Sequence, residues 1–370
     1  MRSIFKGKDI KTKLLLPGIL FLSLVILSAC GAPAATEAPA APAAPAATQA
    51  PAPIEPSEGL PVTYGQDSRI EAFQHTDTKL QEMAASVAIF VHKDQVNISK
   101  NSVSLQGYTL NEMSEMGWLV NGANVPMCTG ELFTSQIAPG FCTGFLVSDD
   151  ILVTAGHCLE KTACADTRIV FGYRLESSNS MAPLTSKDVF KCAEVIAQTT
   201  PTPDNQSLDY ALIKLDRPSG RAGLAYATDD QLEAQDQVAV LGYPSGLPLK
   251  IASDAFVMSN TLSDPFFVAN LDTFGSNSGS PVINTDTYQV EGILVRGMTD
   301  YVLSDNRSCV RVNHCPESGG ANCSGENATK MAMIAEQIPT NTATVPNEPS
   351  CFPTLLLVFA VLVLLRLKPR

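Results

Sequence analysis

The chain has 370 residues, a formal net charge of −12 and a hydrophobic content of 45%. This length leaves room for a domain of two barrels and for extensions at both ends. Residues 1–29 are basic, so the remainder is more acidic than the total suggests. A nucleic-acid partner would require a basic surface, and the composition therefore argues against one. We interpret the acidity as a contribution to solubility.

The N-terminus is typical of an export signal, because a basic start precedes an apolar run from Leu14 to Leu27. The sequence Leu27-Ser28-Ala29-Cys30 resembles the bacterial lipobox. This resemblance implies a lipoprotein signal peptide at residues 1–29 and a lipid on Cys30. An ordinary cleaved signal that ends near a cysteine is the alternative. A lipid on Cys30 would hold the protein on a membrane of the bacterial cell envelope, outside the cytoplasm.

Residues 30–61 are mostly Ala and Pro, with too few large apolar side chains to form a core. Proline favours extended chain, so we expect a spacer between the membrane and a folded domain. At the other end, a polar linker (339–351) precedes a hydrophobic segment with a basic tip (352–370). This segment is shorter than the roughly 20 residues that span a bilayer comfortably. It resembles the C-terminal sorting signals of some bacterial surface proteins. A thin transmembrane helix is the alternative, and in both cases the basic tip stays cytoplasmic.

The folded domain is predicted to cover residues 62–338, and the sequence leaves open whether 62–85 is a removable propeptide. The pattern over Ile70–Met83 has mixed helical spacing. Short apolar runs separated by turn-rich loops predict strands, as in an antiparallel barrel. These predicted strands are Ser86–His92, Ile169–Tyr173, Val189–Ile196 and Ala211–Leu215.

Ten cysteines occur, of which eight lie between the terminal apolar segments. An even number after an export signal is typical of disulfides. Metal binding is the alternative, but the chain has no Cys-x-x-Cys pair, and His314-Cys315 has no second close ligand pair. We therefore expect disulfides, no metal and no other cofactor.

Two segments resemble the first barrel of the chymotrypsin/trypsin-like serine peptidase family. They are Phe141–Val147 and Ile151–Cys158, which contains Thr-Ala-Gly-His-Cys. The resemblance implies a disulfide between Cys142 and Cys158, which would fix the loop that orients the His157 imidazole. A Cys164–Cys192 pair is a weaker prediction, and the pairing of the remaining cysteines (Cys128, Cys309, Cys315 and Cys323) stays open.

Further segments resemble the second barrel of the same family. Val238–Lys250 is similar to the entry strand of bacterial glutamyl-endopeptidase-like enzymes, and Val290–Gly297 is similar to the strand that pairs with a bound peptide. The resemblance covers roughly Ser86 to Ile338. It implies an all-β fold of two six-stranded antiparallel Greek-key barrels, with the active site between them.

His157, Asp209 and Ser278 follow one another in the chain order of a serine peptidase triad. Asp209 begins an apolar strand, and Ser278 lies in the tight run Asn277-Ser278-Gly279-Ser280-Pro281. Taken singly, each could be a structural residue. Together, and in family-like contexts, they predict Ser278 as the nucleophile, His157 as the general base and Asp209 as the group that orients the imidazole.

The backbone N–H groups of Ser276 and Ser278 are the expected oxyanion hole. The family usually has glycine at the position of Ser276, so this serine puts catalytic efficiency in question. Related zymogens with an aspartate at the position of Asn277 become active when a new N-terminal ammonium pairs with it. Asparagine is uncharged, so we predict that this chain is not activated through such an ion pair.

The residues expected in the specificity pocket are Asp272, Thr273, Val295, Arg296 and Gly297. Asp272 lies six residues before Ser278, which matches the acidic pocket floor of trypsin and implies a preference for Arg or Lys. Leu294 occupies the place of the pocket histidine of glutamyl endopeptidases, which argues against acidic specificity. Arg296 could occupy or neutralise the pocket.

The sequence thus predicts an exported, membrane-anchored serine endopeptidase that acts on protein or peptide substrates. One alternative is a protease-like binding module at the cell surface, with weak or lost catalysis. Another is a structural envelope lipoprotein that uses the same barrels.

Overall fold

A computed structural model of the chain describes residues 63–201, 208–320 and 323–339. The predicted signal peptide, Cys30, the Ala/Pro-rich spacer, the 339–351 linker beyond its first residue and the C-terminal hydrophobic segment lie outside these residues. The described residues all belong to one compact unit. Among them, no helix has both the length and the apolar character needed to cross a membrane.

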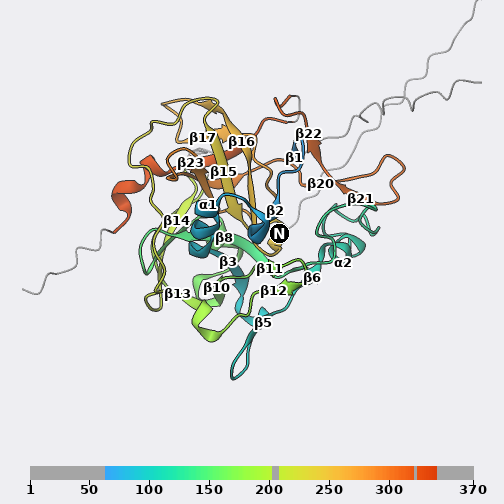
Figure 1. Ribbon diagram of the computed structural model, residues 1–370, viewed down its shortest axis with the longest axis horizontal. Helices are drawn as coiled ribbons and strands as arrows, with labels where there is room; N and C mark the ends of the chain where they lie inside the picture. Colours follow the sequence, from blue (N-terminus) through green and yellow to red (C-terminus); the bar gives the residue numbers. More distant parts are fainter. Residues whose placement is uncertain (1–62, 202–207, 321–322, 340–370) are drawn as a thin grey trace, which may run out of the picture. The chain divides into compact units, whose positions relative to one another are not determined.

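The first barrel is closed by six antiparallel strands (Figure 1). Around the barrel they follow the order β3-β8-β9-β14-β13-β10, so the last three strands run against their order in the chain. Large apolar side chains of its strands, such as Phe90, Phe145 and Phe190, are fully buried. The six strands are β3 (Val87–His92), β8 (Gly140–Leu146), β9 (Ile151–Thr154), β10 (Thr167–Phe171), β13 (Val189–Thr199) and β14 (Tyr210–Leu215).

The second barrel follows the same plan, and its strands are yellow to orange in Figure 1. Its cyclic order is β15-β16-β17-β23-β19-β18, in which the last three strands are again reversed. Its strands are β15 (Gln237–Gly242), β16 (Lys250–Asn260), β17 (Phe266–Ala269), β18 (Pro281–Asn284), β19 (Val290–Arg296) and β23 (Glu326–Lys330). The predicted fold of two six-stranded antiparallel barrels is therefore confirmed.

The predicted strands agree with β3, β10, β13, β14, β15 and β19 to within a few residues at their ends. The mixed spacing over Ile70–Met83 resolves into two parts. Ile70 and Glu71 form the short strand β2 against the start of β16. The helix α1 covers only Thr78–Met83, and it begins there because the Asp77 carboxylate caps it by accepting the N–H groups of Lys79 and Leu80.

The other described elements are short and belong to neither barrel. The two remaining helices are α2 (Leu110–Glu115) and α3 (Cys158–Lys161). Two-stranded sheets pair β1 (Thr63–Tyr64) with β22 (His314–Cys315), β4 (Val96–Ile98) with β5 (Val103–Leu105), β6 (Tyr108–Thr109) with β7 (Ile137–Ala138), β11 (Leu175–Ser177) with β12 (Ser180–Met181), and β20 (Tyr301–Leu303) with β21 (Val310–Val312).

Three disulfides join distant parts of the described chain. Cys142–Cys158 and Cys164–Cys192 have the pairings predicted from the sequence. Cys128–Cys309 joins the segment after α2 to the turn between β20 and β21, across a sequence separation of 181 residues. Three disulfides are typical of a protein that folds outside the reducing cytoplasm.

We expect the double variant Cys142→Ala/Cys158→Ala to lose roughly 3 kcal/mol of unfolding free energy, because this bridge closes a short loop in the unfolded chain. Urea unfolding followed by fluorescence measures the loss. The bridge Cys164–Cys192 spans 28 residues rather than 16, so its double alanine variant serves as a control with a slightly larger expected loss. A loss below about 1 kcal/mol for both pairs would contradict this account.

Candidate active site

His157 and Asp209 are brought together by two neighbouring strands of the first barrel. His157 lies between β9 and α3, and Asp209 lies directly before β14, which pairs with β9 through Ala211 and Thr154. Asp209 Oδ2 is 2.8 Å from His157 Nδ1, and Asp209 Oδ1 accepts the His157 backbone N–H at 3.1 Å. A buried carboxylate at this distance favours the tautomer with the proton on Nδ1, which leaves the Nε2 lone pair without a proton.

Ser278 comes to the same place from the second barrel. It lies in the loop before β18, and its carbonyl oxygen accepts the N–H of Thr143 at 2.9 Å. The sulfur of Cys158, the residue after His157, is 3.6 Å from the same oxygen. In the described chain the Ser278 hydroxyl makes no hydrogen bond of its own. The hydrogen bond between a serine hydroxyl and a histidine base is often long in structures without substrate, and it shortens when substrate binds.

Ser276 adopts a left-handed backbone conformation, with a φ of 72°. A serine reaches this conformation at a cost of about 1 kcal/mol or more. Two contacts to the first barrel stabilise it: Ser276 Oγ donates to the Gly140 carbonyl, and its own carbonyl accepts from Thr143 Oγ1. These hydrogen bonds allow a serine at the position where the family usually has glycine. A glycine could make the bond through its carbonyl but not the one through a side-chain hydroxyl.

The two N–H groups predicted to form the oxyanion hole have no acceptor within the described residues, whereas their neighbours are all engaged. Gly275 N–H donates to Asp300 Oδ2, Asn277 N–H donates to the Phe274 carbonyl, and Gly279 N–H donates to the Leu294 carbonyl. Gly279 has a φ of 90°, and a Cβ there would lie 2.0 Å from the Thr143 carbonyl oxygen. The close approach of the two barrels therefore requires glycine at position 279.

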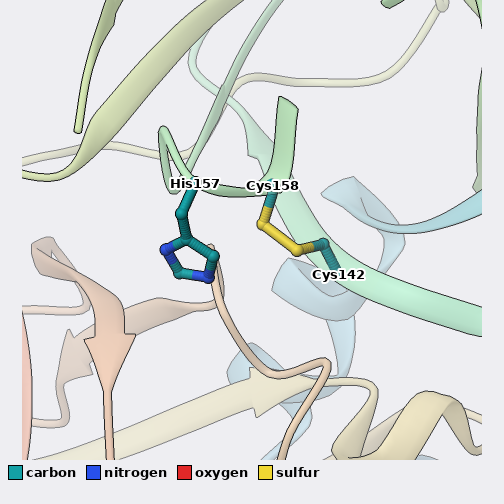
Figure 2. Close-up of side chains that lie close together, drawn as sticks. All are labelled: Cys142, His157 and Cys158. Atoms are coloured by element: carbon teal, nitrogen blue, oxygen red, sulfur yellow. A yellow bond between two sulfur atoms is a disulfide. The ribbon is translucent and has the colours of Figure 1, made fainter. Parts of the chain in front are cut away.

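Cys142, His157 and Cys158 form a compact group of side chains (Figure 2), whose possible metal-ligating atoms lie within 4.8 Å of one another. Both sulfurs are used in the Cys142–Cys158 disulfide, and a disulfide offers no thiolate to a metal ion. The group is therefore a bridge that supports the histidine loop, as the sequence predicted, and not a metal centre.

A cavity of about 340 Å³ opens beside Ser278. It brings together four of the five predicted pocket residues, namely Thr273, Val295, Arg296 and Gly297. The Arg296 guanidinium lies 5.7 Å from the centre of the Phe266 ring. The remaining lining residues are Leu119, Phe274, Gly275, Leu294, Met298, Asp300 and Glu326.

Asp272, the fifth predicted pocket residue, does not line this cavity. Its Oδ1 accepts the Tyr64 N–H, and its Oδ2 accepts both the N–H and the hydroxyl of Ser68, each at 2.7 Å. The carboxylate is buried and its acceptor sites are directed at the N-terminal segment. Asp272 therefore anchors residues 64–68, and the structure does not bring it to the pocket floor.

Glu326 supplies the buried carboxylate of the cavity instead. It begins β23 and is 1% exposed, with Oε2 accepting from Thr273 Oγ1 at 3.0 Å and Oε1 accepting from the Met298 N–H at 3.2 Å. A Cβ on Gly297 would lie 1.8 Å from Oε2, so the carboxylate lies directly against that glycine. Burial, with a smaller contribution from the nearby charges of Asp300 and Asp272, raises the pKa of Glu326 to about 8.

Asp300 adds a second carboxylate to the cavity wall. Burial raises its pKa to about 6, although the Gly275 N–H stabilises the charged form. Sequence reasoning did not identify Glu326 or Asp300. The sequence does show acidic residues on the segments after β19. Their position in the cavity depends on the pairing of β19 with β23, which the sequence does not show.

These carboxyl groups give a prediction for stability. Burial raises the pKa values of Asp272 and Asp300 to about 6 and that of Glu326 to about 8, all above their ordinary values. The folded state therefore binds more protons than the unfolded state between about pH 4 and pH 8, and the free energy of unfolding falls as pH rises through this window. We expect the Tm to decrease between about pH 5 and pH 8, and Glu326→Gln to flatten the decrease. A Glu326→Gln slope equal to that of the unmodified protein would contradict the assignment.

In comparisons with known proteins, residues 142–293 match the family model of the trypsin-like peptidase domain, and this span includes His157, Asp209 and Ser278. No curated protein matches the chain. Among solved structures, the chain is similar to the VesB protease of Vibrio cholerae, with 15% identity and a TM-score of 0.42; the match covers 69% of this chain and 63% of that one. It is also similar to a Glu endopeptidase solved in complex with MPD, with 16% identity and a TM-score of 0.42; that match covers 75% of this chain and 97% of the other.

Proposed function

We propose that this chain is an exported serine endopeptidase that hydrolyses peptide bonds through His157, Asp209 and Ser278. The observation that carries the proposal is the position of the paired His157 and Asp209 side chains, on one barrel, beside the Ser278 loop of the other. The match of residues 142–293 to the trypsin-like peptidase domain supports the same reaction class.

In the proposed reaction, His157 Nε2 takes the proton of the Ser278 hydroxyl as its oxygen attacks the substrate carbonyl carbon. The N–H groups of Ser276 and Ser278 stabilise the oxyanion. His157 then donates the proton to the leaving amine, which breaks the peptide bond and leaves an acyl group on Ser278. Water, activated by the same imidazole, releases the acyl group. Asp209 holds the ring and stabilises its cation at each stage.

The proposed substrate preference is for Arg or Lys before the cleaved bond, with Glu326 rather than Asp272 as the determinant. A basic side chain that enters the cavity would meet Glu326 and Asp300, whose carboxyl groups have raised pKa values. A cation next to a buried carboxyl favours its charged form, so binding of such a side chain would release a proton from the pocket.

The proposal extends to location: a lipid on Cys30 and the apolar C-terminal segment would keep the enzyme at the bacterial cell surface. The Ala/Pro-rich residues 30–61 would separate the catalytic domain from the membrane.

The test is covalent labelling of the purified protein by a fluorophosphonate, next to a Ser278→Ala variant, together with a peptide-library digest. We expect labelling and cleavage in the unmodified protein, neither in the variant, and enrichment of Arg and Lys at the cut sites. A folded, oxidised protein that is neither labelled nor active would overturn the proposal and favour a protease-like binding module.

A further inference from the structure

We propose that Arg69 is a positioning residue that braces the loop carrying Ser276 and Ser278, and that residues 63–71 remain part of the active enzyme as a strap beneath that loop. This inference rests on the proposed function, because it concerns the geometry of the same oxyanion site.

Arg69 is a buried cation with a dedicated partner. It is 3% exposed, and its Nε and Nη2 atoms donate to the two carboxylate oxygens of Asp67 at 2.9 and 2.7 Å. Burying a charge is costly unless it is paired and its hydrogen-bonding groups are satisfied. An arginine that is buried at this cost, with its own acidic partner two residues away, does not serve solubility, so we look for its role in the contacts of its guanidinium.

The face of the guanidinium packs against the nucleophile loop. Its central carbon lies 3.8 Å from the centre of the Phe274 ring and 5.5 Å from the centre of the Phe133 ring. A desolvated cation over an aromatic face is an attractive contact. The Phe274 carbonyl accepts the Asn277 N–H, so the residue held by Arg69 also begins the turn that leads to Ser278.

Arg69 acts on the same loop through Asp300 as well. The Asp300 carboxylate accepts the Gly275 N–H, directly before Ser276, while the Gly275 carbonyl accepts the Ser245 N–H. Burial raises the pKa of Asp300, and the positive charge of Arg69 opposes that rise. Arg69 thus favours the ionised carboxylate that holds Gly275 in place.

The strap is fastened on both sides of Arg69. Before it, Tyr64 and Ser68 donate to the Asp272 carboxylate, two residues ahead of Phe274, and β1 pairs with β22. After it, β2 pairs with β16, where the buried Lys250 ammonium contacts Glu71 at 3.0 Å. Arg69, Asp272 and Asn277 line one small gap under the loop. Asn277 is uncharged, so Arg69 brings a positive charge from the strap to this gap, which Lys250 also lines.

The experiment compares Arg69→Met and Arg69→Lys in the full chain, with the exposed Lys187→Met as a charge-matched control. A small fluorophosphonate that does not reach the specificity cavity measures the labelling rate of Ser278, and thermal unfolding checks the fold. We expect Arg69→Met to lower the labelling rate and kcat between about tenfold and 100-fold, as for a reacting group displaced by about 1 Å. Arg69→Lys should recover part of the loss, and Lys187→Met should have no effect.

If Arg69→Met fails to fold, Phe274→Leu tests the same contact, because it removes the ring face and leaves the buried ion pair of Arg69 and Asp67. It should lower the labelling rate similarly, and unchanged labelling in either folded variant would overturn the inference. If the unmodified protein is not labelled at all, the proposed function fails instead. If it is labelled and the variants match it, only the bracing role fails.

Discussion

Replacing Asp209 with asparagine is expected to lower kcat by about four orders of magnitude while the protein stays folded. The Asp209 carboxylate accepts both the His157 Nδ1–H and the His157 backbone N–H. An asparagine can keep one acceptor for the backbone but then presents its NH₂ group to Nδ1. The imidazole must carry its proton on Nε2 in that arrangement, and it can no longer take the proton of Ser278.

The measurement is kcat on a peptide substrate, with the Tm as a check on the fold. A matched control is Asp216→Asn, which changes a carboxylate that flanks the far end of β14 and lies in an exposed ion pair with Arg217. A surface pair of this kind contributes little, about 1 kcal/mol or less, so activity should be retained. If the kcat of Asp209→Asn lies within about tenfold of the kcat of the unmodified enzyme, the proposed triad is wrong.

Replacing Glu326 with glutamine is expected to reduce kcat/KM for substrates with Arg or Lys before the cleaved bond by roughly 100-fold, since a buried charge-assisted contact is lost. The unmodified enzyme should also show a rise in kcat/KM as pH increases toward about 8, because the ionised Glu326 carboxylate binds the cation and the neutral form does not. This rise should be smaller in Glu326→Gln than in the unmodified enzyme, because only the contribution of the Glu326 carboxylate is removed.

The control for this prediction is Asp272→Asn, which tests the assignment suggested by the sequence alone. Asp272 contacts the strap and not the cavity, so its replacement should lower the Tm and leave the ratio of basic to neutral cut sites unchanged. If Asp272→Asn removes the preference for basic residues and Glu326→Gln does not, the roles proposed for the two carboxylates are reversed.

The contrast between Asp272 and Glu326 shows where prediction from sequence reaches its limit. The catalytic candidates lie in short motifs whose local turn and strand contexts predict their positions, and several of the barrel strands follow from short apolar runs. The pocket depends on which residues face a cavity across paired strands. Position six before Ser278 indicated Asp272, but the hydrogen bonds that satisfy its carboxylate come from residues more than 200 positions earlier in the chain. No local pattern contains that information.

Ser276 is a second example of this limit of prediction from sequence. The sequence showed a departure from the usual glycine but not its consequence, because the groups that hold its left-handed conformation, the Gly140 carbonyl and Thr143 Oγ1, belong to the first barrel. The cysteines are an intermediate case. The motif at 142–158 predicted one bridge, whereas the pairing of Cys128 with Cys309 required the fold.

The Cys128–Cys309 bridge bears on what happens when such a chain is nicked. All three proposed catalytic residues lie inside the covalent ring that this disulfide closes. A single cut between residues 128 and 309, whether by another peptidase or by a second copy of this one, would therefore release no fragment. The clipped protein would run as one species on a gel until a reductant is added. On the cell surface it would keep both ends, and with them its proposed attachment.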